Sequence, residues 1–150
     1  MVSDWFSIHE NPRVPFYIIV DPLNGPGNGS QPNVDYAGCI PKLVAPNTKI
    51  VGYVDTDKGT RPPANITRDI NTYNGWNSTY RPVGIFFDQV NTVTQLLDFY
   101  LAAANTARTL GLNYVRLRPS VCAPVSQSIA PVDCAQPWHP GQRCKVLHVR

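Results

Sequence analysis

The hydrophobic positions fall into short unbroken runs separated by polar segments. Three of these runs, residues 16–20, 49–54 and 83–87, are each followed by an aspartate. Short apolar runs rich in β-branched and aromatic residues predict strands buried on both faces. A fourth strand is predicted over residues 113–117.

Between the strands, the apolar residues recur at helical spacing. Helices are predicted over residues 34–43, 65–76 and 92–109, with Asn65 and Asn91 as N-caps of the last two. A short helix is expected over residues 4–11, ended by prolines. The predicted apolar stripe of the helix 92–109 comprises Val93, Leu96, Leu97, Tyr100, Leu101 and Ala104.

The three aspartates are spaced like repeated structural units. Asp21, Asp55 and Asp88 are separated by 34 and 33 positions, the length of one strand–loop–helix–loop unit. Consecutive parallel strands joined by right-handed crossovers bring their carboxyl ends to one side of a sheet. The sequence therefore predicts an α/β fold, either part of a parallel (β/α)8 barrel or a small doubly wound sheet.

Length and composition divide the chain in two. A complete (β/α)8 barrel needs about 250 residues, and this chain has 150. We expect a partial barrel domain over residues 1–118 with about three to four β/α units, and an irregular tail over residues 119–150. The tail holds three of the four cysteines. Disulfides within it would be possible in an oxidising compartment.

The spacing of the tail's cysteines and histidines matches no standard zinc pattern, and no metal or cofactor is expected. The residues concerned are Cys122, Cys134, His139, Cys144 and His148.

Charge and hydropathy exclude two classes of partner. Charged residues make up only 15% of the chain and the net charge is +3, without a basic stripe interleaved with aromatics. This argues against nucleic-acid binding. No apolar run approaches the roughly 20 residues of a membrane span. Polar residues interrupt the segment 1–10, so this segment does not have the apolar stretch of a signal peptide.

Three N-glycosylation sequons begin at Asn28, Asn65 and Asn77. They favour a secreted or cell-surface protein, although chance alone would supply one or two in a chain this rich in Asn, Ser and Thr.

Asp88 is the strongest candidate for a catalytic residue. A carboxylate at the carboxyl end of a parallel strand can act as nucleophile, acid or base on a sugar. It can equally cap the helix that follows, and the residues alone leave both roles open. Asp21 and Asp55 would line the same side of the sheet. The glycine-rich loop 24–29 either lets the backbone approach a ligand or is a plain turn.

Other side chains have two possible roles each. Arg61 could pair with a site carboxylate or remain a solvated surface arginine. Tyr53, Trp76 and Tyr80 could stack on sugar rings or belong to the core; for Tyr53 a core role is favoured.

Four ordered segments together resemble a known family. F-Y-I-I-V-D-P-L-N-G-P-G, V-G-Y-V-D-T-D-K-G-T-R, T-Y-N-G-W and V-G-I-F-F-D-Q resemble the spherulin-4-like (spherulation-specific) cell-surface proteins. The resemblance implies a (β/α)8 barrel and a relationship to glycoside hydrolases that cleave galactosamine-containing polysaccharide. It implies that Asp88 is catalytic. The implied substrate-binding residues are Gln89, Asp21, Asn24, Tyr53, Asp55 and Arg61.

The chain departs from the family pattern in ways that bear on activity. Gln89 stands where the family has a glutamate, and an amide can bind a sugar hydroxyl but cannot donate a catalytic proton. After Asp98 the only acidic residue is Asp133, and the first and last strands of a barrel are missing, as in a truncated member. Two hypotheses follow: a piece of a secreted or surface glycoside hydrolase in which Asp88 is the retained catalytic carboxylate, or a non-catalytic protein that binds polysaccharide or serves a structural role at the cell surface. Gln89 and the lack of later acidic residues favour the second as regards the activity of this chain.

Overall fold

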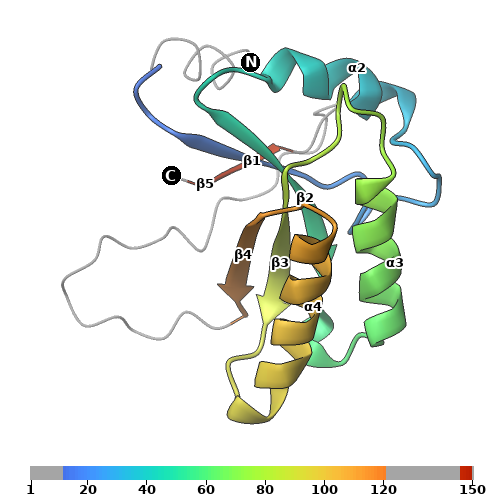
Figure 1. Ribbon diagram of the computed structural model, residues 1–150, viewed down its shortest axis with the longest axis vertical. Coiled ribbons are helices and arrows are strands. Elements are labelled where there is room, and N and C mark those ends of the chain that lie inside the picture. Colours follow the sequence, from blue (N-terminus) through green and yellow to red (C-terminus); the bar gives the residue numbers. More distant parts are fainter. Residues whose placement is uncertain (1–11, 121–145, 150) are drawn as a thin grey trace.

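The chain folds around one five-stranded sheet with helices on one face. The computed structural model describes residues 12–120 and 146–149. The strand order is β4-β3-β2-β1-β5 (Figure 1). The strands are β1 (Phe16–Val20), β2 (Thr48–Asp55), β3 (Gly84–Val90), β4 (Tyr114–Pro119) and β5 (Val146–Val149).

The first four strands are parallel, and each pair is joined by a helix. β1 pairs with β2, β2 with β3 and β3 with β4 in parallel register, whereas β5 pairs with β1 antiparallel. The connecting helices are α2 (Val34–Leu43), α3 (Pro63–Asn74) and α4 (Leu97–Thr109), with short 3-10 turns η1 (Asp57–Gly59) and η2 (Thr94–Leu96). The predicted α/β class and its repeated units are confirmed, in the arrangement of a partial barrel.

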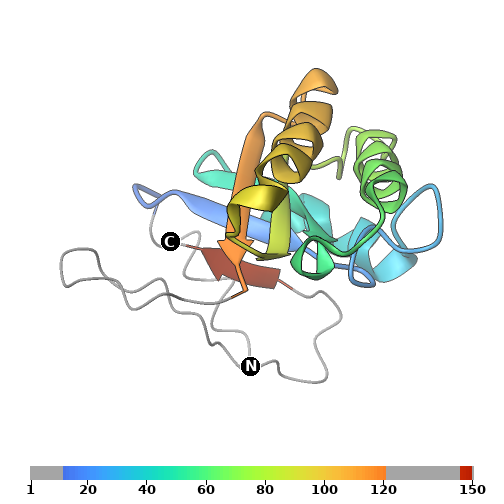
Figure 2. The same cartoon turned by 90° about the horizontal axis from the view of Figure 1, so that it is seen from below.

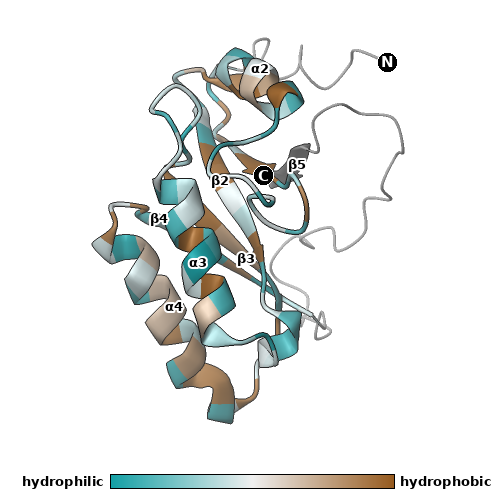
Figure 3. Cartoon of the chain, turned by 90° about the vertical axis from the view of Figure 1, so that its right-hand side faces the viewer, coloured by the Kyte–Doolittle hydropathy of each residue, from teal (hydrophilic) through white to brown (hydrophobic). Residues whose placement is uncertain are grey.

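The main core lies between the sheet and the helices, since α3 and α4 cover the same side of the sheet (Figure 2). Alternate residues of the strands, such as Ile18, Ile50 and Ile85, meet the apolar side of α2, α3 and α4 there. Hydrophobic and hydrophilic residues alternate along α3, as expected for a helix with one buried side (Figure 3).

A glycine in β2 allows α3 to lie close to the sheet. A Cβ atom at Gly52 would stand 2.8 Å from the ring of Tyr73, so no larger side chain fits without displacing it. The Tyr73 hydroxyl donates to the carbonyl oxygens of Val20, at 3.1 Å, or Tyr53, at 2.9 Å. The ring of Tyr73 thus fixes the distance between α3 and the ends of β1 and β2.

The opposite face of the sheet carries a smaller cluster and three cations. Ile19, Val51, Tyr53 and Phe86 are buried together, with Tyr17 against them. Each cation lies over an aromatic ring: Lys49 over Tyr114 at 5.2 Å, Arg116 over Tyr17 at 4.9 Å and Arg118 over Phe86 at 6.0 Å. Contacts of this kind let long charged side chains pack on an apolar surface.

Two helix predictions need correction. α3 begins at Pro63, because proline suits the first helical turn, and Asn65 lies inside the helix instead of capping it. The segment predicted as one helix over residues 92–109 is divided into η2 and α4. The buried side of α4 consists of Tyr100, Ala103, Ala104 and Ala107, whereas Val93, Leu97 and Leu101 of the predicted stripe are exposed.

α2 has its predicted bounds. Its N-cap is Asn33, whose side chain accepts a hydrogen bond from the Tyr36 amide. Cys39 in this helix is disulfide-bonded.

The tail expected to be irregular over residues 119–150 contains the strand β5 at residues 146–149, because these residues pair with β1, a contact between distant segments. The helix expected over residues 4–11 and the tail's three cysteines lie outside the described residues.

Candidate functional site

The three strand-end aspartates gather at one end of the sheet. Asp55 and Asp88 are register partners on β2 and β3, and Asp21 follows the last residue of β1. Asp21 and Asp88 are buried, while Asp55 is half-buried. The common placement predicted from the 34- and 33-residue spacing is therefore confirmed. We call Asp21, Asp55 and Asp88, with Tyr53 between them, the aspartate rim.

The Asp88 carboxylate receives four hydrogen bonds although the residue is only 5% exposed. The Tyr53 hydroxyl donates to Oδ2 at 2.8 Å, and the Gln89 amide donates to Oδ1 at 2.7 Å. Arg118 adds two parallel bonds, Nε to Oδ1 at 2.6 Å and Nη2 to Oδ2 at 2.8 Å. Such a bidentate ion pair is strong and directional. Both carboxylate oxygens are thus held by protein donors.

An irregularity in β3 places Asp88 and Gln89 in this position. β3 pairs with β4 up to Phe87 and again at Val90, with a register shift between them. Asp88 and Gln89 therefore stand opposite Arg118 alone, which is the arrangement of a β-bulge. Bulges turn side chains to new directions and are frequent next to active sites.

The bulge holds Gln89 in an unusual backbone conformation. Its φ is 54°, in the left-handed region that residues other than glycine seldom adopt. The buried Thr56 secures it, because its hydroxyl oxygen lies 2.7 Å from the Asp88 carbonyl oxygen and 3.1 Å from that of Gln89. Local strain kept in place by neighbouring bonds is typical of functional positions.

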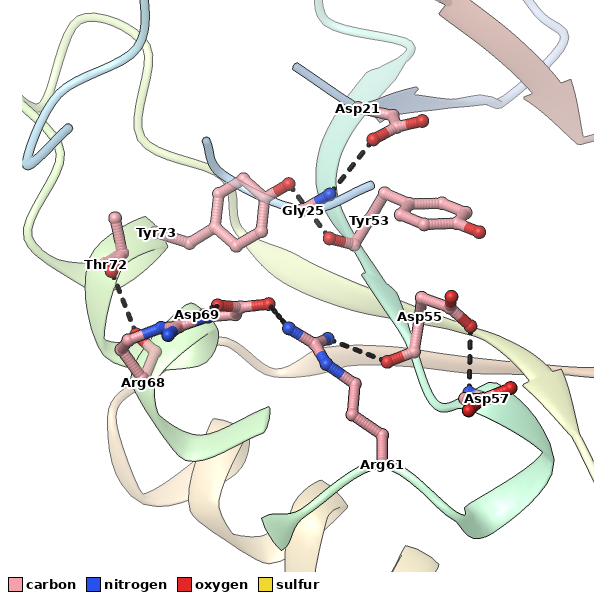
Figure 4. Close-up of polar contacts among 10 residues, drawn as sticks. All are labelled: Asp21, Gly25, Tyr53, Asp55, Asp57, Arg61, Arg68, Asp69, Thr72 and Tyr73. Carbon is pink, nitrogen blue, oxygen red and sulfur yellow. Dashed lines mark hydrogen bonds and ion pairs between the residues drawn. The ribbon is translucent and has the colours of Figure 1, made fainter. Parts of the chain in front are cut away.

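Tyr53 is kept as a hydrogen-bond donor at the centre of the rim. Burial raises the pKa of its phenol well above the usual value, and the bond to Asp88 and the charges of Asp88, Asp55 and Asp21 raise it further. Figure 4 shows Asp21, Tyr53 and Asp55 on the same side of β2, with Tyr73 and Asp69 on the other. Tyr53 therefore remains neutral, and its hydroxyl helps to fix the Asp88 carboxylate.

Arg61 lies beneath the rim and pairs with a different aspartate. Its guanidinium forms an ion pair with the buried Asp69 and donates to the Asp55 carbonyl oxygen at 2.8 Å (Figure 4). Arg68 also contacts Asp69, at 3.1 Å. The alternative of a solvated surface arginine is wrong, because Arg61 is largely buried. Arg61 fixes the end of β2, and its role in substrate binding stays a prediction.

The glycine-rich loop approaches the protein's own interior. The Gly25 amide donates to Asp21 Oδ1 at 3.0 Å. Gly25 has φ 150°, and a Cβ atom there would stand 3.0 Å from a carboxylate oxygen of Asp69. Asn24 is exposed with φ 49°. The loop therefore presents Asn24 outward beside Asp21, where the resemblance predicts a binding residue.

Two proposed aromatic platforms are remote from the rim. Trp76 is buried in the main core, with its ring centroid 4.7 Å from that of Tyr73, so of the two roles left open for it the core role is the correct one. Tyr80 packs against the same core beside Trp76. Both follow α3, at the end of the sheet away from the aspartates. Within residues 12–120 and 146–149, no group of three or more acidic, histidine or cysteine side chains could hold a metal ion.

Sequence reasoning missed two residues of the site. Arg118 belongs to β4, where Tyr114, Arg116 and Arg118 alternate with apolar positions. That period of two marks the face opposite the helices and could have indicated Arg118. Nothing in the sequence singles out Thr56, since its role depends on the bulge in the neighbouring strand.

Comparisons with known proteins agree with this architecture. The profile of the spherulation-specific family 4 matches residues 4–123. Spherulin-4 of Physarum polycephalum is 33% identical over 88 residues, which are 58% of this chain and 25% of that protein. The crystal structure of Aspergillus clavatus Sph3 in complex with GalNAc superposes with a TM-score of 0.72 at 29% identity, covering 79% of this chain and 53% of that one.

The chain spans about a quarter of Spherulin-4 and about half of the Sph3 chain. The family profile nevertheless covers most of its length, including all three strand-end aspartates. The parallel strand–helix units and the matching profile lead to one assignment: this chain belongs to the spherulation-specific family 4.

Proposed function

We propose that this protein binds an amino-sugar polysaccharide at the aspartate rim, as a secreted or cell-surface protein. The observation that carries the proposal is the convergence of Asp21, Asp55 and Asp88 around the Tyr53 hydroxyl. Carboxylates, amides and a phenol at the carboxyl ends of parallel strands suit the hydroxyl, acetamido or ammonium groups of such a sugar. The relative Sph3 was crystallised with GalNAc.

Binding without cleavage is supported by the state of Asp88. A retaining or inverting glycosidase needs two carboxyl groups that can reach the substrate. Here both oxygens of Asp88 are occupied, and the guanidinium of Arg118 balances its charge. Gln89 supplies an amide beside it. In this proposal Asp88 and Gln89 orient the sugar, while Asn24 and Asp55 contact it from the neighbouring strand ends.

Hydrolysis is the second candidate, favoured by one observation. Asp55 lies beside Asp88 in register, and its carboxylate has no ion-pair partner among the described residues. A second carboxylate is therefore close at hand. If a substrate displaced Arg118, Asp88 would become available as the partner of Asp55.

The test is a binding titration of the full chain with galactosamine-rich polymers, one N-acetylated and one with free amines. We expect saturable binding that is weakened at least about tenfold by Asp88→Ala, the equivalent of about 1.4 kcal/mol. Arg108→Ala, on the exposed last turn of α4, is the control and should bind as the parent does. Equal affinity in parent and Asp88→Ala chains would refute the proposed site.

Cleavage is measured in parallel by the release of new reducing ends. The parent and Asp88→Asn chains should release none, and a Gln89→Glu chain tests whether a restored carboxylate is sufficient for activity. Cleavage by the parent that Asp88→Asn abolishes would replace the binding role with the hydrolytic one.

No helix in the described part of the chain is long and apolar enough to cross a membrane.

A further inference from the structure

The three sequons occupy different structural settings. Asn28 lies in the loop between β1 and α2, Asn65 lies within α3, and Asn77 lies in the connection from α3 to β3. Asn28 and Asn77 are exposed, whereas Asn65 is half-buried. The sequence pattern is the same at each site, so the setting decides which of them can carry a sugar.

Asn77 is exposed, and its side-chain oxygen is held by a hydrogen bond. The Thr79 amide donates to Asn77 Oδ1 at 3.0 Å, which closes an Asx-turn across the sequon. Gln31 fixes the backbone, accepting from the Asn77 amide at 2.9 Å and donating to the Gly75 carbonyl at 2.9 Å. None of the hydrogen bonds in the described part of the chain uses Asn77 Nδ2, the atom to which an N-glycan is attached.

Asn65 differs in each of these respects. It is the third residue of α3, and the helical pattern commits the Thr67 amide to the carbonyl four residues earlier. The Asx-turn found at Asn77 therefore cannot form there. Asn65 is half-buried and lies four residues before the buried Asp69, a spacing that puts both on the same side of the helix. A glycan on Asn65 would have to emerge from this half-covered position.

We propose that Asn77 is an N-glycosylation site of this protein and that Asn65 is not. In the transfer, Asn77 Nδ2 forms a bond to the anomeric carbon of a lipid-pyrophosphate-linked oligosaccharide. The bond from that carbon to the pyrophosphate oxygen breaks, the lipid pyrophosphate leaves, and the amide loses one proton to the transferase. The proposal rests on the extracellular location in the proposed function. A disulfide at Cys39 is independent support, since such bonds persist in oxidising compartments.

A glycan at Asn77 would leave the aspartate rim open. The connection from α3 to β3 lies at the end of the sheet near α2, and the arrowhead of β3 marks the opposite end (Figure 1). From Gly84 to Asp88, β3 alone spans about 13 Å at the usual rise per residue. The modification therefore covers one end of the sheet and the proposed polysaccharide site the other.

The test directs the full chain into the secretory pathway of a eukaryotic host with an added signal sequence. All variants carry Asn28→Gln, so that only the two remaining sequons are compared. The readout is the glycosidase-sensitive mobility of the total chain, whether retained or released, with mass spectrometry of the modified peptide. We expect one glycan, unchanged in Asn65→Gln and lost in Thr79→Ala, which removes the acceptor hydroxyl but keeps the backbone donor of the Asx-turn.

A glycan that persists in Thr79→Ala, is lost in Asn65→Gln, or is absent altogether would overturn the proposal. Polymer binding is measured separately on the deglycosylated chain. A failure of binding therefore refutes the proposed function and leaves the glycosylation result standing, and the reverse holds as well.

Discussion

Replacing Arg118 with alanine tests whether the ion pair with Asp88 organises the rim. The substitution removes two charge-assisted bonds from a carboxylate that is 5% exposed. Breaking a fully buried pair costs roughly 3–5 kcal/mol. The Arg118 side chain is 42% exposed, so solvent takes over part of its role. We therefore expect a loss of about 2 kcal/mol in the free energy of unfolding.

The assay is urea and thermal unfolding of the full chain. At about 4 °C per kcal/mol for a domain of this size, the melting temperature should fall by about 8 °C. Arg108→Ala is the matched control, since Arg108 lies exposed on the last turn of α4 and its loss should cost under about 0.5 kcal/mol.

A double-mutant cycle isolates the pair from the rest of the side chain. In an Asp88→Asn background, Arg118→Ala should cost only about 0.5–1 kcal/mol, because no buried charge is left behind. The coupling energy should therefore be about 1–1.5 kcal/mol. If Arg118→Ala costs the same in both backgrounds, or no more than Arg108→Ala, the ion pair does not organise the rim and the reasoning fails.

Three further outcomes follow from the structure. Tyr53 and Tyr73 have pKa values raised above the usual 10.0 in the folded chain. The free energy of unfolding should therefore be unaffected by these groups below about pH 10 and fall above it by about 1.4 kcal/mol per pH unit for each tyrosine. Unfolding measured against pH should show about half that slope in Tyr53→Phe. Gly84→Ala should prevent normal folding, seen as a lost cooperative transition, because its Cβ would stand 1.9 Å from a backbone oxygen, whereas Gly38→Ala in α2 should stabilise by about 0.5–1 kcal/mol. Gln89→Gly should raise stability by up to about 1 kcal/mol by relieving the positive φ, and should weaken polymer binding; unchanged binding would exclude the amide from the site.

The sequence was sufficient for the features that depend on local pattern. The bounds of β1 and α2 were predicted to the residue, because Pro15 and Pro22 flank β1 and Pro46 follows α2. The shared end of Asp21, Asp55 and Asp88 followed from the unit length and the handedness of parallel crossovers. These predictions required no knowledge of long-range contacts.

Features that depend on contacts between distant segments were not predictable. A bulge at Asp88 and Gln89 leaves no local sequence sign, and it decides that Arg118 reaches Asp88. The exposed part of the α4 stripe has a similar origin. Leucines at helical spacing predict a buried side, but the buried side of α4 is formed by Tyr100 and three alanines, and which side packs inward is decided by the segments around the helix.

The antiparallel strand β5 limits how this sheet could grow. In a closed parallel barrel the first strand accepts a parallel neighbour on each side, yet here β1 already has β5 along one edge and β2 along the other. Any additional parallel strand must therefore join beyond β4, unless β5 first leaves. As long as β5 is paired with β1, the sheet of this protein can be extended only at the β4 edge, and β5 blocks extension at the other edge.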